Sequence, residues 1–198
     1  MENPTLFQIY GSLVLVQLIF GLHYLTTSLI VDRVDAFEWT AIRILFAGIL
    51  MFLFYRKRIL HFPKGKDWNF LILLSLLGII LNTALFTKGL ELTTPAHASL
   101  LSCMIPVMTL IFAWILGYEE MNRYKSLSLI IAMSGALILL GIDDLDISSD
   151  LFLGDILVFI NFTCFGLFLV LSKSMIKHHS PLGLSVLVMS IGAVLLVP

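Results

Sequence analysis

The sequence predicts an all-α, polytopic membrane bundle. Three observations predict it: high apolarity, regularly spaced uncharged stretches, and connections that alternate in charge. Hydrophobic residues make up 59% of the 198-residue chain and charged residues 13%, whereas a soluble domain averages about 45–50% apolar and about 25% charged residues. A globule could not cover its surface with so few polar side chains, and a bilayer removes that need.

Seven uncharged or nearly uncharged stretches define the expected elements. Each approaches the roughly 20 residues that a helix needs to cross a bilayer, and in lipid a helix satisfies its own backbone groups. The first stretch is too long for the apolar core of a signal peptide, so it is expected to stay in the membrane. The expected spans are Leu6–Val31, Trp39–Tyr55, Trp68–Thr87, Pro95–Tyr118, Ser126–Ile142, Ile156–Ser172 and Ser180–Pro198.

The connections between these spans alternate between basic and acidic. Because basic loops stay in the cytoplasm, the chain is expected in the cytoplasmic (inner or plasma) membrane with its N-terminus inside. The expected cytoplasmic loops carry Arg56, Lys57, Arg58, Lys64, Lys66, Arg123, Lys125, Lys173 and Lys177. The other side carries Arg33 and Lys88 beside Asp32, Asp35, Glu38, Glu91, Asp143, Asp144, Asp146, Asp150 and Asp155.

A short internal repeat divides the chain into two units. Phe20-Gly21-Leu22 recurs as Phe165-Gly166-Leu167, and at the same shift 35–37 corresponds to 180–182. Because five spans are an odd number, a second unit must insert upside down relative to the first. We expect a complete five-helix repeat over residues 1–142, an acidic non-cytoplasmic loop over 143–155, and two helices of a second, inverted repeat over 156–198.

Several motifs then resemble a known family. The stretch 91–101, followed by Pro106-Val107, by Gly117-Tyr118-Glu119-Glu120 and by Ser134-Gly135-Ala136, is similar to the EamA-type repeat of the drug/metabolite transporter superfamily. Arg43 corresponds to an arginine common in that family's second helix, and Ser128 stands where a glycine is usual. The resemblance implies ten spans in two inverted repeats, so we expect this chain to be part of such a protein.

Polar side chains inside the predicted spans are candidate site residues, because an ionisable group in a bilayer needs a reason to be there. His23, Arg43, Asn82, Lys88, His97 and Asn161 all fall in the expected outer half of the membrane, which suggests a polar vestibule. The predicted substrate pathway comprises His23, Arg43, Asn82, Ser99, Ser102 and Asn161.

Arg43 could orient an anionic group of the substrate, such as a carboxylate. Alternatively, Arg43 pairs with Glu38 or Asp35, or reaches the outer headgroups. His23 could relay protons or serve as a hydrogen-bonded packing residue. Lys88 and Glu91 are expected to form a pair at a helix end.

Span 4 carries two further candidates. Pro106 has no N–H to donate to the Ser102 carbonyl, so we expect a kink that frees this carbonyl, either as a gating hinge or as plain packing. Glu119, the motif glutamate that the resemblance implies, is expected to neutralise Arg123 and Lys125. Cys103 and Cys164 are expected to be small packing residues rather than a disulfide or metal site.

The predicted function is secondary transport of a small organic metabolite or drug by alternating access, as an exporter or exchanger. A proton gradient or exchange is the expected energy source, because the sequence has no nucleotide-binding glycine loop. No enzymatic activity, cofactor, metal or nucleic acid is expected. The expected partners are a small-molecule substrate and the lipid bilayer, and homodimer formation stays open.

Two alternatives remain open at this stage. A seven-helix receptor fits the number of spans, but such receptors usually place the N-terminus outside. A retinal protein would also need a lysine in the last helix, and Ser180–Pro198 contains none. A non-transporting membrane scaffold or fragment is the other alternative.

Overall fold

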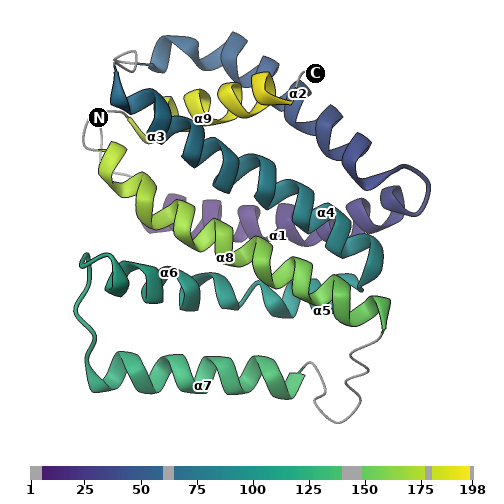
Figure 1. The fold of residues 1–198 in the computed structure, drawn as a ribbon, viewed down its shortest axis with the longest axis vertical. Helices are drawn as coiled ribbons and strands as arrows, with labels where there is room; N and C mark the ends of the chain where they lie inside the picture. The colour runs from purple at the N-terminus through teal and green to yellow at the C-terminus, as the bar shows by residue number, and fades with distance from the viewer. Residues whose placement is uncertain (1–5, 60–64, 140–148, 177–179, 197–198) are drawn as a thin grey trace.

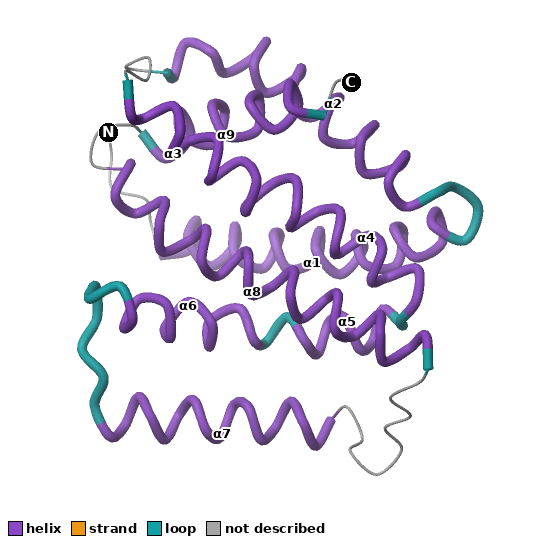
Figure 2. Tube along the Cα trace, in the orientation of Figure 1, coloured by secondary structure: helices purple, strands orange, loops and turns teal. Residues whose placement is uncertain are grey.

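The computed structural model describes residues 6–59, 65–139, 149–176 and 180–196, and the regular structure in these ranges is helical. Figures 1 and 2 show helices that run back and forth between two ends of the molecule. The helices are α1 (Leu6–Val31), α2 (Ala36–Tyr55), the 3₁₀ turn η1 (Arg56–Arg58), α3 (Lys66–Ser75), the π-helical segment η2 (Leu76–Leu81), α4 (Asn82–Leu92), α5 (Pro95–Leu101), α6 (Met104–Ile115), α7 (Arg123–Leu139), α8 (Asp150–Ile176) and α9 (Pro181–Leu195).

Five helical stretches within the described ranges are long and apolar enough to cross a membrane. They correspond to α1, to α2, to α3 continued through η2 and α4, to α5 with α6, and to α8. The remaining two, α7 and α9, have 17 and 15 residues respectively. The prediction of an all-α, polytopic membrane bundle is confirmed.

Charge separates the two ends of the bundle. Helix ends that carry Arg56, Arg123 and Lys173 lie at one end, on the left of Figure 1. The connection from α1 to α2 and the start of α8 lie at the opposite end. The alternation of charge along the sequence therefore separates basic from acidic groups at the two ends of the folded molecule.

Helix α8 is the centre of the packing and contacts α4, α5 and α6, while α9 packs on α2 and α3. A buried cluster joins α4, α5 and α8 through Phe86, Leu90, Ala98, Leu101, Val158 and Phe162. Helix α7 lies at the margin, against α5 and α6. Most of α1 is exposed apolar surface, as expected for a helix facing lipid.

Two glycines allow α4 and α8 to approach closely. A methyl group added to Gly154 would come within 2.7 Å of the Thr93 nitrogen, and one added to Gly89 would lie 3.0 Å from the Gly154 carbonyl oxygen. Small residues at such crossings let helix backbones meet in membranes, where no hydrophobic effect drives them together. The α4–α8 crossing is therefore a tightly packed seam.

The predicted acidic loop over 143–155 is wrong in its second half. Helix α8 begins at Asp150, so Asp155 lies in its second turn instead of in a loop. Asp150, in the first turn, is favourable there because a helix N-terminus carries a partial positive charge. The first part of that loop, 143–148, lies outside the described residues.

Candidate functional site

Arg43 lies in the first half of α2, whose start is fixed by Asp35. The Asp35 carboxylate accepts hydrogen bonds from the backbone nitrogens of Phe37 and Glu38, which makes it a typical N-cap. Two turns further on, Arg43 donates from Nη2 to Nε2 of His23 on α1 at 2.7 Å. Its guanidinium carbon also lies 5.9 Å from the centre of the Trp39 ring.

The partner of Arg43 is thus an uncharged ring. A guanidinium group can only donate, so Nε2 of His23 must accept, and the imidazole is neutral with its proton on Nδ1. The ring packs 5.5 Å from Phe86 of α4 and edge-on to Tyr24 at 6.3 Å, measured between centroids. The His23–Arg43 contact therefore leaves the arginine charge uncompensated.

Three polar atoms on this part of α2 have no hydrogen-bond partner among the described residues. They are Nε1 of Trp39, Oγ1 of Thr40 and Nη1 of Arg43, and all three are buried. Buried polar groups in folded proteins are nearly always paired, so an unpaired group needs an explanation. Trp39 and Arg43 can only donate, so the partners that these two groups lack are acceptors.

The alternative in which Arg43 pairs with Glu38 or Asp35 is wrong. Asp35 is engaged as the helix cap, and the ion pairs found among the described residues involve other groups. Arg43 is only partly exposed, and its Nη1 atom is buried.

Asn82 and Asn161 are brought together, but inside the α4–α8 seam. The amide nitrogen of Asn161 donates to both the backbone oxygen and the side-chain oxygen of Asn82. Asn161 is only 1% exposed. The Asn82 amide nitrogen donates to the Gly78 carbonyl instead, and Oδ1 of Asn161 is buried without a partner among the described residues. The hydrogen bonds from Asn161 therefore connect α8 to α4.

Lys88 and Glu91 form the expected ion pair at 2.8 Å, near the end of α4.

His97, which was expected to lie in the polar vestibule, contacts an aspartate of α8 instead. Its Nδ1 lies 2.9 Å from Oδ2 of Asp155, whose other oxygen accepts a hydrogen bond from the Thr93 hydroxyl. Asp155 thus ties α8 to the connection between α4 and α5.

Sequence reasoning did not select Asp155 as a site residue. It was assigned to the acidic loop because four other aspartates precede it within 143–150. One signal could have found it: Asp155 lies six residues before Asn161, at the start of an otherwise apolar helix. A carboxylate there needs a partner when the helix packs against its neighbours.

Span 4 is interrupted at Ser102–Cys103, where α5 ends and α6 begins, close to the kink expected from Pro106. The prediction of a freed Ser102 carbonyl is wrong, because this oxygen accepts from the Ile105 nitrogen at 3.0 Å. A tighter bond to a residue three positions on replaces the one that Pro106 cannot make. The Ser102 hydroxyl donates back to the Ser99 carbonyl at 2.6 Å, while the Ser99 hydroxyl bonds Ala96.

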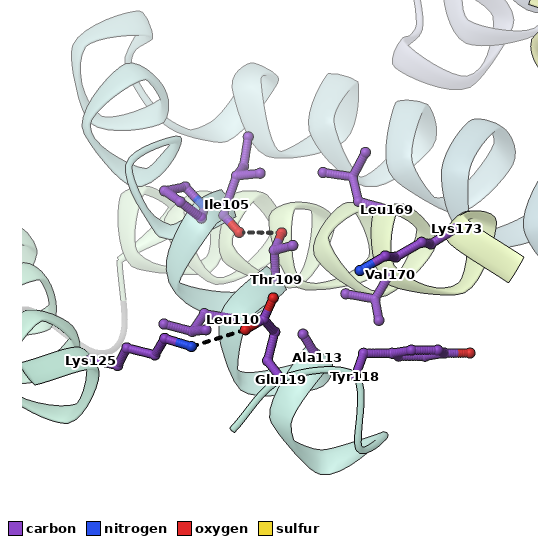
Figure 3. A pocket seen from close by; sticks show the side chains of 11 residues that line it. Ile105, Thr109, Leu110, Ala113, Tyr118, Glu119, Lys125, Leu169, Val170 and Lys173 are labelled. Atoms are coloured by element: carbon purple, nitrogen blue, oxygen red, sulfur yellow. Dashed lines mark hydrogen bonds and ion pairs between the residues drawn. The ribbon is translucent and has the colours of Figure 1, made fainter. Parts of the chain in front are cut away.

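Pro106 and Glu119 line a cavity of about 590 Å³ at the basic end of the bundle. Figure 3 shows Lys125 and Lys173 approaching from opposite sides, with Glu119 between them. The cavity is lined by Ile105, Pro106, Thr109, Leu110, Ala113, Tyr118, Glu119, Lys125, Leu169, Val170 and Lys173.

Glu119 pairs with Lys125, as expected, at 2.9 Å. The hydrogen bond and charge of Lys125, with a smaller contribution from Lys173, hold the pKa of Glu119 below its ordinary value of 4.5. Arg123 does not share this carboxylate. Its guanidinium carbon lies 5.4 Å from the centre of the Tyr124 ring instead.

Neither a metal centre nor a disulfide forms in the part of the chain that the structure describes. No group of three or more histidine, cysteine, aspartate or glutamate side chains gathers there. Cys103 is an exposed free thiol beside the α5–α6 break, and Cys164 is a half-buried one on α8.

Comparisons with known proteins agree with this architecture. The chain is 29% identical over 153 residues to the uncharacterized transporter YyaM of Bacillus subtilis, which covers 76% of this chain and 50% of that relative. It is 26% identical over 188 residues to an uncharacterized transporter of Archaeoglobus fulgidus, covering 94% of this chain and 64% of that relative. The chain thus spans between half and about two thirds of the length of these relatives, and no solved structure matches it significantly.

The resemblance noted in the sequence extends over most of the bundle. The EamA-like transporter family matches residues 8–141, from the first turn of α1 to just beyond the described part of α7. Because this match covers more than half of the chain, the chain belongs to the EamA-like transporter family, within the drug/metabolite transporter superfamily.

Proposed function

We propose that this chain carries the substrate-recognition part of a secondary transporter that moves a small organic anion across the cytoplasmic membrane by alternating access. The observation that carries the proposal is the Arg43 guanidinium, which has no carboxylate partner among the described residues. An ionised side chain at the centre of a membrane helix costs about 2.5–3.5 kcal/mol on insertion scales. A carboxylate brought by the solute would offset that cost through two parallel hydrogen bonds.

The two other unpaired groups beside Arg43 support the same ligand. Trp39 can donate one hydrogen bond from Nε1, and Thr40 can donate from its hydroxyl. Together with Nη1 of Arg43 they form a set of donors on consecutive turns of α2. A carboxylate offers acceptor oxygens for these donors and also compensates the Arg43 charge, which a neutral solute could not do.

These atoms are shielded from solvent, so a solute can reach them only when the surrounding helices move apart. Alternating access supplies such a movement, because it rocks one repeat against the other around a site near the midplane. The drive would be a proton gradient or exchange for a second solute, and the direction would be that of an exporter or an exchanger.

Two corresponding features support an inverted repeat as the basis of this movement. Asp35 and Ser180, which occupy equivalent positions in the repeated segments, are both N-caps, of α2 and α9. These two helices also pack against each other. Equivalent helices that meet in this way are expected around the pseudo-twofold axis of an inverted repeat.

The test is a counterflow assay on the chain reconstituted in liposomes, which are loaded in turn with small carboxylates or with their neutral amides. We expect carboxylates to exchange and amides not to exchange. Arg43→Gln should lower the initial rate about 10- to 100-fold, the equivalent of one charge-assisted hydrogen bond, and Arg43→Lys should retain part of it. An imposed proton gradient identifies the drive if it accelerates net uptake.

Arg33→Gln is the matched control, because Arg33 is exposed in the connection between α1 and α2. It removes the same charge on the same side of the bundle and should leave the rate unchanged. Equal exchange of amides and carboxylates, or an unaffected Arg43→Gln variant, would contradict the anion assignment. No flux from any solute pool would favour a non-transporting scaffold.

A further inference from the structure

The cavity at the basic end has more positive than negative charge. Two ammonium groups, of Lys125 and Lys173, face one carboxylate, that of Glu119. The carboxylate is engaged by Lys125 at 2.9 Å. Lys173 has no ion-pair partner among the described residues, and its Nζ lies 5.9 Å from the centre of the Tyr118 ring.

The Tyr118 ring can stabilise the Lys173 charge through its π face. At an exposed site, however, such a contact contributes only about one third of the free energy of a charge-assisted hydrogen bond. The ammonium group therefore keeps its donors available for a stronger acceptor. Its position in the last turn of α8 holds it at the rim of the cavity.

The cavity walls are apolar. Ile105 and Leu110 of α6 face Leu169 and Val170 of α8. The Thr109 hydroxyl, which also lines the cavity, already donates to the Ile105 carbonyl at 2.7 Å. A ligand that fits this lining has a nonpolar body and one charged end.

We propose that this cavity binds a small amphipathic organic monoanion, with Lys173 as its charge partner. Its volume of about 590 Å³ falls within the roughly 300–1,000 Å³ of small-molecule sites. A single negative charge would balance the one ammonium group that Glu119 leaves uncompensated. The inference rests on the proposed function for its role, as a second site for the same class of solute.

The test is equilibrium binding, which does not depend on transport. The chain is placed in nanodiscs of a zwitterionic lipid and titrated calorimetrically with 4-phenylbutyrate, and in parallel with the neutral 4-phenylbutan-1-ol. We expect saturable binding of the carboxylate and about 10- to 100-fold weaker binding of the alcohol. Lys173→Gln should weaken carboxylate binding by a similar factor, and Lys173→Arg should retain most of it.

Three variants separate this site from the rest of the molecule. Lys57→Gln removes an exposed charge at the same end of the bundle, on η1 and outside the cavity lining, and should not change binding. Arg43→Gln should also bind normally, so that a failed transport assay and a failed binding assay remain distinct results. Leu169→Trp, which would fill the cavity from a partly exposed wall position, should abolish binding without removing a charge.

The proposal is overturned if the acid and the alcohol bind equally, or if Lys173→Gln and Leu169→Trp both bind as the unmodified chain does. Loss of binding in Arg43→Gln alone would move the ligand to the other site and would also overturn it. So would a cavity that takes only phosphatidylglycerol added to the nanodiscs, because the occupant would then be a lipid headgroup and not a free solute.

Discussion

Asp155 connects α8 both to the end of α4 and to the start of α5. Its carboxylate receives hydrogen bonds from the Thr93 hydroxyl and lies against Nδ1 of His97. The side chain is 13% exposed, so these partners replace most of its contact with water. One aspartate therefore fixes where α8 starts relative to the turn between α4 and α5.

Replacement of Asp155 by alanine should destabilise the fold by about 1–3 kcal/mol, because Thr93 and His97 would keep their polar groups in a partly buried place without a partner. The measurement is reversible unfolding in mixed detergent micelles. Asp150→Ala is the matched control, since Asp150 is exposed in the first turn of the same helix. If both variants lose the same stability, the carboxylate acts through the helix N-terminus and not through its partners.

At the scale of elements, the α4–α8 seam is a closely packed contact between helix backbones. Gly89 and Gly154 bring the two backbones together, and the Asn82–Asn161 hydrogen bonds lie further along the same crossing. Close backbone approach increases dispersion contacts, which are a main driving force for helix association in lipid. Movement of the bundle is thus expected elsewhere, with α4 and α8 remaining together.

The variant Gly154→Ala tests this seam. Its added methyl group would lie 2.7 Å from the Thr93 nitrogen and 2.8 Å from the Leu92 carbonyl carbon, both of which are backbone atoms that cannot rotate away. We expect a loss of about 1–3 kcal/mol from overpacking, measured by thermal unfolding. Gly21→Ala, at a helical glycine with no neighbouring atom within 4 Å, should cause no loss. Equal stability of both variants would contradict the close approach of α4 and α8.

The whole molecule is polar along the direction of its helices. Basic groups of η1, α7 and α8 lie at one end, and the acidic starts of α2 and α8 lie at the other. In a membrane this arrangement gives one orientation a lower free energy, because basic segments are retained on the cytoplasmic side.

A cysteine accessibility experiment tests that orientation. In a chain with Cys103→Ser and Cys164→Ala, single cysteines are introduced as Lys57→Cys or Asp150→Cys and are treated with a membrane-impermeant maleimide. We expect Asp150→Cys to react on intact cells and Lys57→Cys to react only after permeabilisation. If both react from the same side, the alternation of the connections, and with it the transport proposal, would be wrong.

Much of this protein follows from patterns along the sequence. Apolar stretches of membrane length required helices, because lipid leaves backbone groups no other partner. The order of charges required the two ends to differ. Pro106 predicted a kink in the fourth span, and the structure has an interruption nearby, at Ser102–Cys103. These properties depend on residues that are close together in the chain, so no knowledge of the packing was needed to predict them.

Only the tertiary structure decided which polar side chains meet. Arg43 meets His23 across 20 residues, His97 meets Asp155 across 58, and Asn161 meets Asn82 across 79. Such pairs depend on how each helix is rotated about its axis, and the nearly uniform apolarity of α1 and α8 carries little information about that rotation. Close contacts between helix backbones fix the rotation, and they determine that the arginine lacks an acidic partner.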